Sequence, residues 1–255
     1  MRFLPALSYW IAVLAACALW LAMLAIGSGD GIPGEVFRSL HLGRGNPAID
    51  ATRLLSRFGG WMWLTALSVA TGIFLVWRKR PRRAATFLLM AFVGRLLVEL
   101  QKLFFAHPRP DATEHLVRVS SMSFPSAHAA NSMIVYLGIA ALAPMPRRWR
   151  PAAVGAAFLA SLLIGLSRIA LGVHWLADVI GGWAFGLMWV LLLLRLGSAR
   201  ADPESEPVNA HTGNTLRRPF VLRVKEKGHG QSQDAGRPRS RRFGSDRGNG
   251  GRAEP

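Results

Sequence analysis

Three short stretches of this 255-residue sequence gather the residue types that phosphate chemistry uses. The first runs from Lys102 to Pro110, the second from Ser123 to His128, and the third from Ser167 to Asp178. Each stretch lies at the end of an apolar segment, so all three can converge on one pocket. Seven of their residues are candidates for this chemistry, three cations, two histidines, one serine and one carboxylate: Lys102, Arg109, Arg168, His128, His174, Ser126 and Asp178.

The cations suit a phosphoryl group, because phosphoryl transfer asks a protein mainly for positioning and charge stabilisation. Lys102, Arg109 and Arg168 can neutralise the non-bridging oxygens, and an arginine can bind two of them at once. Ser126 stands where a helix is expected to begin, so it can be the N-cap while the free N–H groups of the first turn point at an anion. His128 lies in the same turn, close enough to protonate a leaving oxygen.

His174 and Asp178 are four residues apart, which places both side chains on one face of a helix. The carboxylate can accept a hydrogen bond from one imidazole nitrogen and fix the tautomer of the ring. The lone pair of the other nitrogen is then free to attack. Taken alone this spacing is weak evidence, and the two neighbouring stretches are what give it weight.

Six apolar segments come near the ~20 residues that a membrane-spanning helix needs. The sequence therefore predicts an all-α fold, a six-transmembrane-helix bundle. The first segment exceeds the ~7–15 apolar residues usual in a signal peptide, so a retained anchor is favoured over cleavage. The segments run from about Ser8 to Gly27, Gly60 to Trp77, Ala84 to Phe105, Ala127 to Ala143, Ala152 to Leu166 and Trp175 to Leu196.

Basic residues gather in the links after the second and fourth segments, at 78–83 and 147–150. Both links lie on the same side if all six segments span, and the positive-inside rule makes that side cytoplasmic. Both termini are then cytoplasmic as well. The three chemistry-bearing stretches are expected at the outer, periplasmic face of the inner membrane.

The sequence is 51% hydrophobic yet has a formal charge of +17, because its apolar and basic residues are segregated. The short Arg clusters indicate topology, so no nucleic-acid partner is expected. Residues 1–197 are expected to form the membrane domain. Residues 198–255 are rich in Gly, Ser, Pro and Arg, and they are expected to form a disordered basic cytoplasmic tail. With Cys17 as the single cysteine, an intramolecular disulfide is excluded.

Glu99 is the other acidic residue inside an apolar segment, and ionisable groups at this depth are usually paired or functional. Arg95 stands four residues before it and Lys102 three residues after it, so all three can share one helix face. A structural ion pair between Arg95 and Glu99 is the expected arrangement.

The three stretches resemble the signature of the type 2 phosphatidic acid phosphatase superfamily, Lys-x6-Arg-Pro, then Pro-Ser-Gly-His, then Ser-Arg-x5-His-x3-Asp. The first and third match at every defining position. The second departs at Ala127, where the family has glycine. Alanine keeps the backbone N–H but disfavours a positive φ, so the departure bears on backbone geometry more than on chemistry.

The resemblance implies a role for each matching residue. His174 is expected to be the nucleophile, Asp178 to orient it, and His128 to act as general acid and then as base. The resemblance also implies that no metal and no cofactor take part. The phosphate-binding residues that it implies are Lys102, Arg109, Ser126, Ala127 and Arg168.

The expected function is hydrolysis of a phosphomonoester or pyrophosphate of a membrane lipid. A lipid phosphotransferase could use the same site, and a transporter is a remote alternative because intramembrane ionisable residues can form a substrate path. Phosphatidic acid, phosphatidylglycerol phosphate, a polyprenyl pyrophosphate and lipid A all remain open as substrates. The loop from Ser28 to Gly59 is a candidate surface for reading the headgroup, and the motifs do not indicate the oligomeric state.

Overall fold

The computed structural model describes residues 6–27 and 32–199, and all regular structure in them is helical. Two one-turn 3-10 helices, Ala112–Glu114 and Arg147–Trp149, accompany eight α-helices. The α-helices are α1 (Ala6–Ile26), α2 (Ile32–Leu40), α3 (Ile49–Arg57), α4 (Trp61–Trp77), α5 (Pro81–Phe105), α6 (Ala127–Leu142), α7 (Arg150–Ala170) and α8 (Leu176–Ala199).

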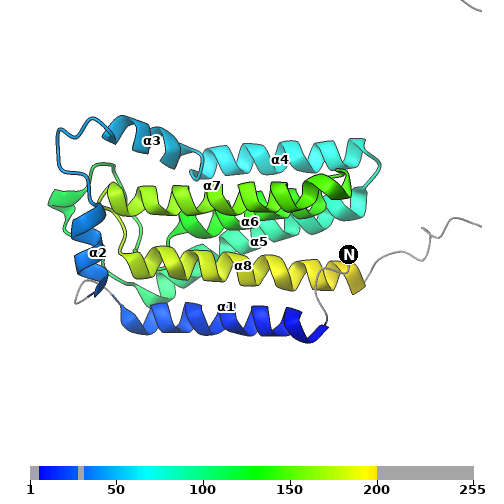
Figure 1. Ribbon diagram of the computed structural model, residues 1–255, viewed down its shortest axis with the longest axis horizontal. Helices are drawn as coiled ribbons and strands as arrows, with labels where there is room; N and C mark the ends of the chain where they lie inside the picture. Colours follow the sequence, from blue (N-terminus) through cyan, green and yellow to red (C-terminus); the bar gives the residue numbers. More distant parts are fainter. Residues whose placement is uncertain (1–5, 28–31, 200–255) are drawn as a thin grey trace, which may run out of the picture. The chain divides into compact units, whose positions relative to one another are not determined.

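The long helices run side by side (Figure 1), with α6 at the centre of the packing. α6 contacts α5, α7 and α8, while α1 lies against α8 and α4 against α5. Met133 and Ile134 of α6 are almost wholly enclosed, whereas α1 leaves many of its large apolar side chains exposed. A helix that is apolar on all sides is typical of a bundle in lipid, where each backbone polar group must be satisfied within the helix.

Five helical stretches are long and apolar enough to cross a membrane. The predicted segments are therefore confirmed at five places, although the second stretch begins at Ile49 and not at the predicted Gly60, because it includes α3 as well as α4. The predicted fourth segment corresponds to α6, whose 16 residues extend only about 24 Å against the ~30 Å of a bilayer core. The five stretches are Leu7–Ile26, Ile49–Trp77, Pro81–Phe105, Arg147–Ala170 and Leu176–Gly197.

Two short helices, α2 and α3, occupy part of the loop between the first two predicted segments, where the sequence predicted no elements. Each is amphipathic and turns its few buried side chains, Phe37 on α2 and Ile49 and Ser56 on α3, inwards. α3 packs on α7, and α2 packs on α7 and α8. This loop is therefore built onto the end of the bundle where α7 stops and α8 starts.

Two further expectations concern α5 and the tail. Arg95, expected to pair with Glu99, instead donates to Thr65 Oγ1 at 3.2 Å and lies over the Trp61 ring, which ties α5 to α4. α8 continues to Ala199, two residues past the predicted domain boundary. The remainder of the predicted tail, from residue 200, lies outside the described residues.

Close packing between α7 and α8 depends on a glycine. An ideal Cβ at Gly165 would stand 2.4 Å from Cζ2 of Trp183. The indole of Trp183 is held by a hydrogen bond from its Nε1 to the Ser161 carbonyl at 3.1 Å, so it cannot move aside freely. Gly155 offers a contrast on the same helix, because a Cβ there meets nothing within 4 Å.

We expect Gly165→Ala to destabilise the bundle by about 1–3 kcal/mol, because the added methyl group overpacks this contact. Gly155→Ala is the matched control, and it should leave the stability unchanged or raise it by up to ~1 kcal/mol. Thermal unfolding in detergent measures both variants. Equal melting temperatures for the two variants would show that the Trp183 ring moves aside with no loss of stability.

Candidate active site

His174 lies in the link between α7 and α8, where the chain reverses direction. Gly172 makes the turn with a φ of +75°, and a Cβ there would stand 2.2 Å from the Glu114 carbonyl oxygen. Only glycine fits such a position. The turn leaves His174 buried, with 2% of its surface exposed, just before α8 begins at Leu176.

Asp178, in the first turn of α8, holds His174 from one side. Its Oδ2 lies 3.3 Å from Nδ1 of His174 and accepts the Trp175 backbone N–H at 2.8 Å. The second bond satisfies a donor at the start of the helix, so the carboxylate is held in place by the helix it caps. The two side chains thus meet as the sequence predicted, but they do not share a helix face, because His174 precedes the start of α8 at Leu176.

Ser123 joins this pair, although the sequence analysis assigned it no role. Its hydroxyl donates a short hydrogen bond to Asp178 Oδ2, and its Oγ lies 3.2 Å from Nδ1 of His174. The side chain is fully buried. Nδ1 of His174 therefore faces two acceptors at once, the carboxylate and the serine oxygen.

Arg109 lies on the opposite side of the imidazole. Its Nη1 is 3.2 Å from Nε2 of His174 and also donates to the Val173 carbonyl at 2.6 Å. A guanidinium can only donate, so Nε2 must be the accepting nitrogen and Nδ1 must carry the ring proton. The contacts therefore assign the tautomer in which Nε2 presents a lone pair.

The surroundings also fix the charge of the ring. Burial lowers the pKa of His174 well below its ordinary value, and the positive charges of Arg109 and Lys102 lower it further. His174 is consequently neutral at physiological pH. A neutral imidazole with an unprotonated Nε2 is the form that can act as a nucleophile.

The other two predicted cations are buried and held by neutral acceptors. Lys102, 2% exposed, donates to the Met122 carbonyl at 2.6 Å and to the Ser123 carbonyl at 3.4 Å. Arg168 donates to Ser56 Oγ at 2.6 Å. Because neither is neutralised by a carboxylate in these contacts, the site keeps an excess of positive charge.

α6 begins beside this cluster, with Ser126 in the N-cap position and Ala127 as its first residue. The Ser126 N–H donates to the Asp178 carbonyl at 2.9 Å, which joins the starts of α6 and α8. Ser126 makes no capping hydrogen bond through its side chain, contrary to expectation. Ala127 is not among the described residues with positive φ, so alanine in place of the family's glycine introduces no strain here.

His128, one residue further along α6, packs against the junction of α3 and α4. An ideal Cβ at Gly59 would come within 3.1 Å of its Cδ2. Within the described part of the chain the imidazole makes no hydrogen bond, so both ring nitrogens are open to a substrate. His128 is close enough to Arg168, Lys102 and Arg109 to interact with their charges.

Two buried donors of the site have no partner in the described structure, the Ser126 hydroxyl and Nε of Arg168. Buried polar groups are normally hydrogen-bonded, so unpaired donors at a candidate site need an explanation. The oxygens of a bound anion would satisfy both donors. Among the described residues there is no group of three or more His, Cys, Asp or Glu side chains suited to a metal ion.

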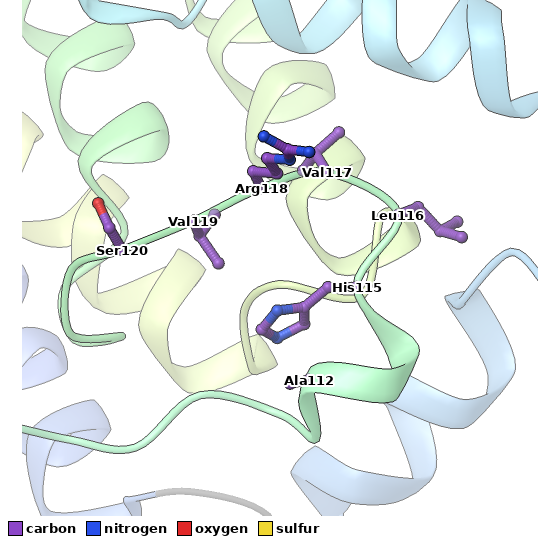
Figure 2. A pocket seen from close by; sticks show the side chains of 7 residues that line it. All are labelled: Ala112, His115, Leu116, Val117, Arg118, Val119 and Ser120. Atoms are coloured by element: carbon purple, nitrogen blue, oxygen red, sulfur yellow. The ribbon is translucent and has the colours of Figure 1, made fainter.

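The connection between Arg109 and Ser123 forms the outer rim of the site. Arg109 holds the far end of this connection through a 2.6 Å bond from its Nε to the Ser121 carbonyl. Residues 112–120 curve around an open pocket of about 630 Å³ (Figure 2), and the figure shows the His115 ring inside the curve and Leu116 pointing out of it. His115 bonds to the Pro110 carbonyl at 3.1 Å.

Comparison with known proteins supports the motif match. The family profile described as the PAP2 superfamily matches residues 83–202. Phosphatidylglycerophosphatase B of Bacillus subtilis is 32% identical over 143 residues, which cover 54% of this chain and 70% of that relative. The chain belongs to the PAP2 superfamily. This confirms the resemblance to type 2 phosphatidic acid phosphatases, and the PAP2 protein is accordingly a membrane phosphatase, a hydrolase of phosphoric esters.

Two further relatives extend the comparison. The undecaprenyl-diphosphatase of Sulfolobus acidocaldarius is 26% identical over 193 residues, or 72% of the PAP2 protein described here and 88% of the relative. The crystal structure of a transmembrane PAP2-type phosphatidylglycerolphosphate phosphatase from Bacillus subtilis superposes with a TM-score of 0.67. That structure is 25% identical, and the match covers 74% of this chain and 97% of the other.

Two site residues were missed by the sequence analysis, Ser123 and Ser56. Ser123 begins the second chemistry-bearing stretch, but nothing in its spacing indicated a contact with a histidine 51 residues away. Ser56 left a clearer signal, because it stands seven residues after Ile49 on the same face of α3. A polar residue on the buried face of an amphipathic helix is a candidate for a specific hydrogen bond.

Removing the Ser123 hydroxyl should loosen the hold on His174. We expect Ser123→Ala to lower kcat about tenfold to a hundredfold with little change in KM, because the misplaced ring attacks less often. Ser120→Ala, in the same connection but exposed, should behave as wild type. Release of p-nitrophenol from p-nitrophenyl phosphate measures both. An unchanged kcat in Ser123→Ala would mean that Asp178 alone positions His174.

Proposed function

We propose that this phosphatase hydrolyses the phosphomonoester or pyrophosphate of a membrane lipid through a covalent phosphohistidine on His174. The proposal rests on the contacts that hold both ring nitrogens of His174. Asp178 and Ser123 hold Nδ1, while Nε2 faces the cation Arg109. A phosphoryl group bound to Arg109 would lie next to the Nε2 lone pair.

In the first step, Nε2 of His174 attacks phosphorus while the bond from phosphorus to the lipid oxygen breaks. The leaving oxygen takes a proton from protonated His128, so the lipid departs as a neutral alcohol, or as a monophosphate when the substrate is a pyrophosphate. His174 keeps its Nδ1 proton. The carboxylate of Asp178 stabilises the positive charge that develops on the ring.

In the second step, His128 is neutral and takes a proton from water, whose oxygen attacks phosphorus. The bond between phosphorus and Nε2 breaks, and its electron pair returns to His174. Inorganic phosphate leaves, and His128 is protonated again for the next cycle. The two histidines thus have different duties, one covalent and one in proton transfer.

The phosphoryl oxygens are bound in this proposal by Lys102, Arg109 and Arg168, with the Ser126 hydroxyl and the Ala127 backbone N–H. The two unpaired donors, Ser126 Oγ–H and Arg168 Nε–H, support this set. Three cations supply the charge stabilisation that a divalent metal would otherwise give. We therefore propose that the reaction needs no metal and no cofactor.

The substrate is proposed only as a class. The relatives named above act on phosphatidylglycerophosphate and on undecaprenyl diphosphate, and this chain is similar to both. The same phosphohistidine could pass its group to an alcohol, which would make the protein a phosphotransferase. Phosphate release from purified protein, assayed over a panel of lipid phosphates with and without added glycerol, separates hydrolysis from transfer.

We further propose that α6 spans as a sixth segment, that both termini are cytoplasmic and that the site faces the periplasm. The site residues lie where α5 and α7 end and where α6 and α8 begin. The basic links 78–83 and 147–150 lie at the opposite end of the bundle, where they join α4 to α5 and α6 to α7 (Figure 1). This separation of site and basic links supports the orientation.

Thiol labelling tests the orientation. Single cysteines at Asp111 and Arg80, each in a Cys17→Ser background, lie in links at opposite ends of the bundle and are both exposed. An impermeant maleimide should label Asp111→Cys in intact cells, whereas Arg80→Cys should react only after lysis. The reverse pattern would invert the proposed topology.

Variants of the two histidines distinguish their proposed roles. His174→Ala should abolish turnover on every substrate. His128→Ala should slow hydrolysis of an aliphatic lipid phosphate by ~10²–10⁴-fold, because an alkoxide needs a proton to leave. With p-nitrophenyl phosphate, whose leaving group needs no proton, the same variant should give a burst of nitrophenol.

The burst should be accompanied by an acid-labile, base-stable phosphoryl label, because the second step lacks its base. The label is followed with a radioactive substrate in the presence of a chelator. A label that forms in His174→Ala and is lost in His128→Ala would reverse the two roles. Complete loss of wild-type activity in chelator, restored by Mg²⁺, would contradict the metal-free reaction.

A further inference from the structure

An apolar groove of about 700 Å³ runs along α1, α5 and α8. Cys17 and Trp20 line it from α1, Leu97 and Leu100 from α5, and Phe185 from α8. These positions extend from the middle of α1 and α8 to the end of α5 that carries the active site. The groove therefore follows the bundle from mid-membrane depth towards the catalytic residues.

The surface of the groove offers a ligand almost no hydrogen bonding. Gln101 is its one amide-bearing residue, and both ends of that amide are already engaged. Its Oε1 accepts from Trp20 Nε1 at 3.0 Å, and its Nε2 donates to the Leu97 carbonyl at 3.1 Å. What remains facing outwards is hydrocarbon, aromatic ring and the small thiol of Cys17, which suits an alkyl or prenyl chain.

The end of the groove that Phe105 lines lies next to the active site. The Phe105 ring, which lines the groove, lies 5.8 Å from the Trp20 ring and 6.0 Å from the Phe124 ring, centroid to centroid. Phe124 is fully buried and directly follows Ser123, the residue that contacts His174 and Asp178. One layer of aromatic rings thus separates the groove from the nucleophile.

Charge and apolar surface meet along α5 at this point. Gln101 lines the groove, while the next residue, Lys102, turns its ammonium to the carbonyls of Met122 and Ser123 at the site. A molecule with an anionic head and a hydrocarbon tail matches both features. A lipid phosphate with its head at Arg109 has the groove beside it for its tail.

We propose that the groove between α1, α5 and α8 binds a hydrocarbon chain of the substrate lipid while its phosphate occupies the catalytic site. This inference rests on the proposed lipid phosphatase function. Because lipid tails are as apolar as leucine, moving a chain from the bilayer into the groove gains little transfer free energy. Its contribution is positional, since a chain held there fixes the depth of the phosphate relative to His174.

Filling the groove tests the proposal. Leu100→Trp places a bulky ring in it, and Leu159→Trp places the same ring on the exposed face of α7, away from the groove. Each variant is assayed in detergent on dipalmitoyl phosphatidic acid and on p-nitrophenyl phosphate. We expect Leu100→Trp to lower kcat/KM about tenfold on the lipid and to leave the tail-less substrate unchanged. Leu159→Trp should match wild type on both.

Cys17 provides a second way to fill the same groove without mutation. N-benzylmaleimide should inhibit hydrolysis of the lipid by the wild type and leave p-nitrophenyl phosphate hydrolysis intact. Cys17→Ser, which the reagent cannot modify, should be insensitive. The proposal would be overturned by equal losses of activity on both substrates. It would also be overturned if neither Leu100→Trp nor modification of Cys17 lowered activity on the lipid.

A binding measurement separates this inference from the proposed function. Phosphatidic acid with a diazirine at the end of one acyl chain should crosslink to peptides of α1 and of the second half of α5, and less so in Leu100→Trp. That result supports the groove even if the wild type hydrolyses a different lipid. Crosslinking spread evenly over the exposed faces of all helices would show ordinary bilayer contact and overturn the groove, whatever the activity.

Discussion

The carboxylate of Asp178 is the point to which the rest of the site is attached. One oxygen receives the N–H of Trp175, the hydroxyl of Ser123 and the ring of His174. The carbonyl of the same residue receives the N–H of Ser126. A single residue thereby joins the start of α8, the start of α6 and the connection between Arg109 and Ser123. This junction fixes the position of the His174 imidazole.

The cations around that junction are held by neutral acceptors. Lys102 and Arg109 bond to backbone carbonyls, and Arg168 bonds to a serine hydroxyl. A carboxylate partner would cancel each charge, whereas a carbonyl only fixes its position. The arrangement keeps several positive charges within a buried site, which is costly without an anion and strongly attractive to one. It also keeps the His174 ring neutral, since protonation would add another cation.

Much of this arrangement could be predicted because it depends on short spacings in the sequence or on the length of apolar runs. The pairing of His174 with Asp178 and the positions of five long helices are of that kind. The partners of Ser123, Ser56 and Arg95 could not be predicted, since these contacts join elements far apart in sequence. The helices α2 and α3 were not predicted for another reason. Nine-residue amphipathic helices contain too few turns for their periodicity to stand out.

α3 has a consequence for how such enzymes can diverge. The superfamily profile begins at residue 83, yet Ser56 bonds Arg168 and Gly59 packs against His128 from well before that point. Arg168 and His128 of the candidate site thus contact a segment that the shared motifs do not define. Two lineages with identical motifs can therefore differ in how firmly Arg168 and His128 are held. Substitutions in α3 offer a route to altered rate and substrate preference that leaves every signature residue in place.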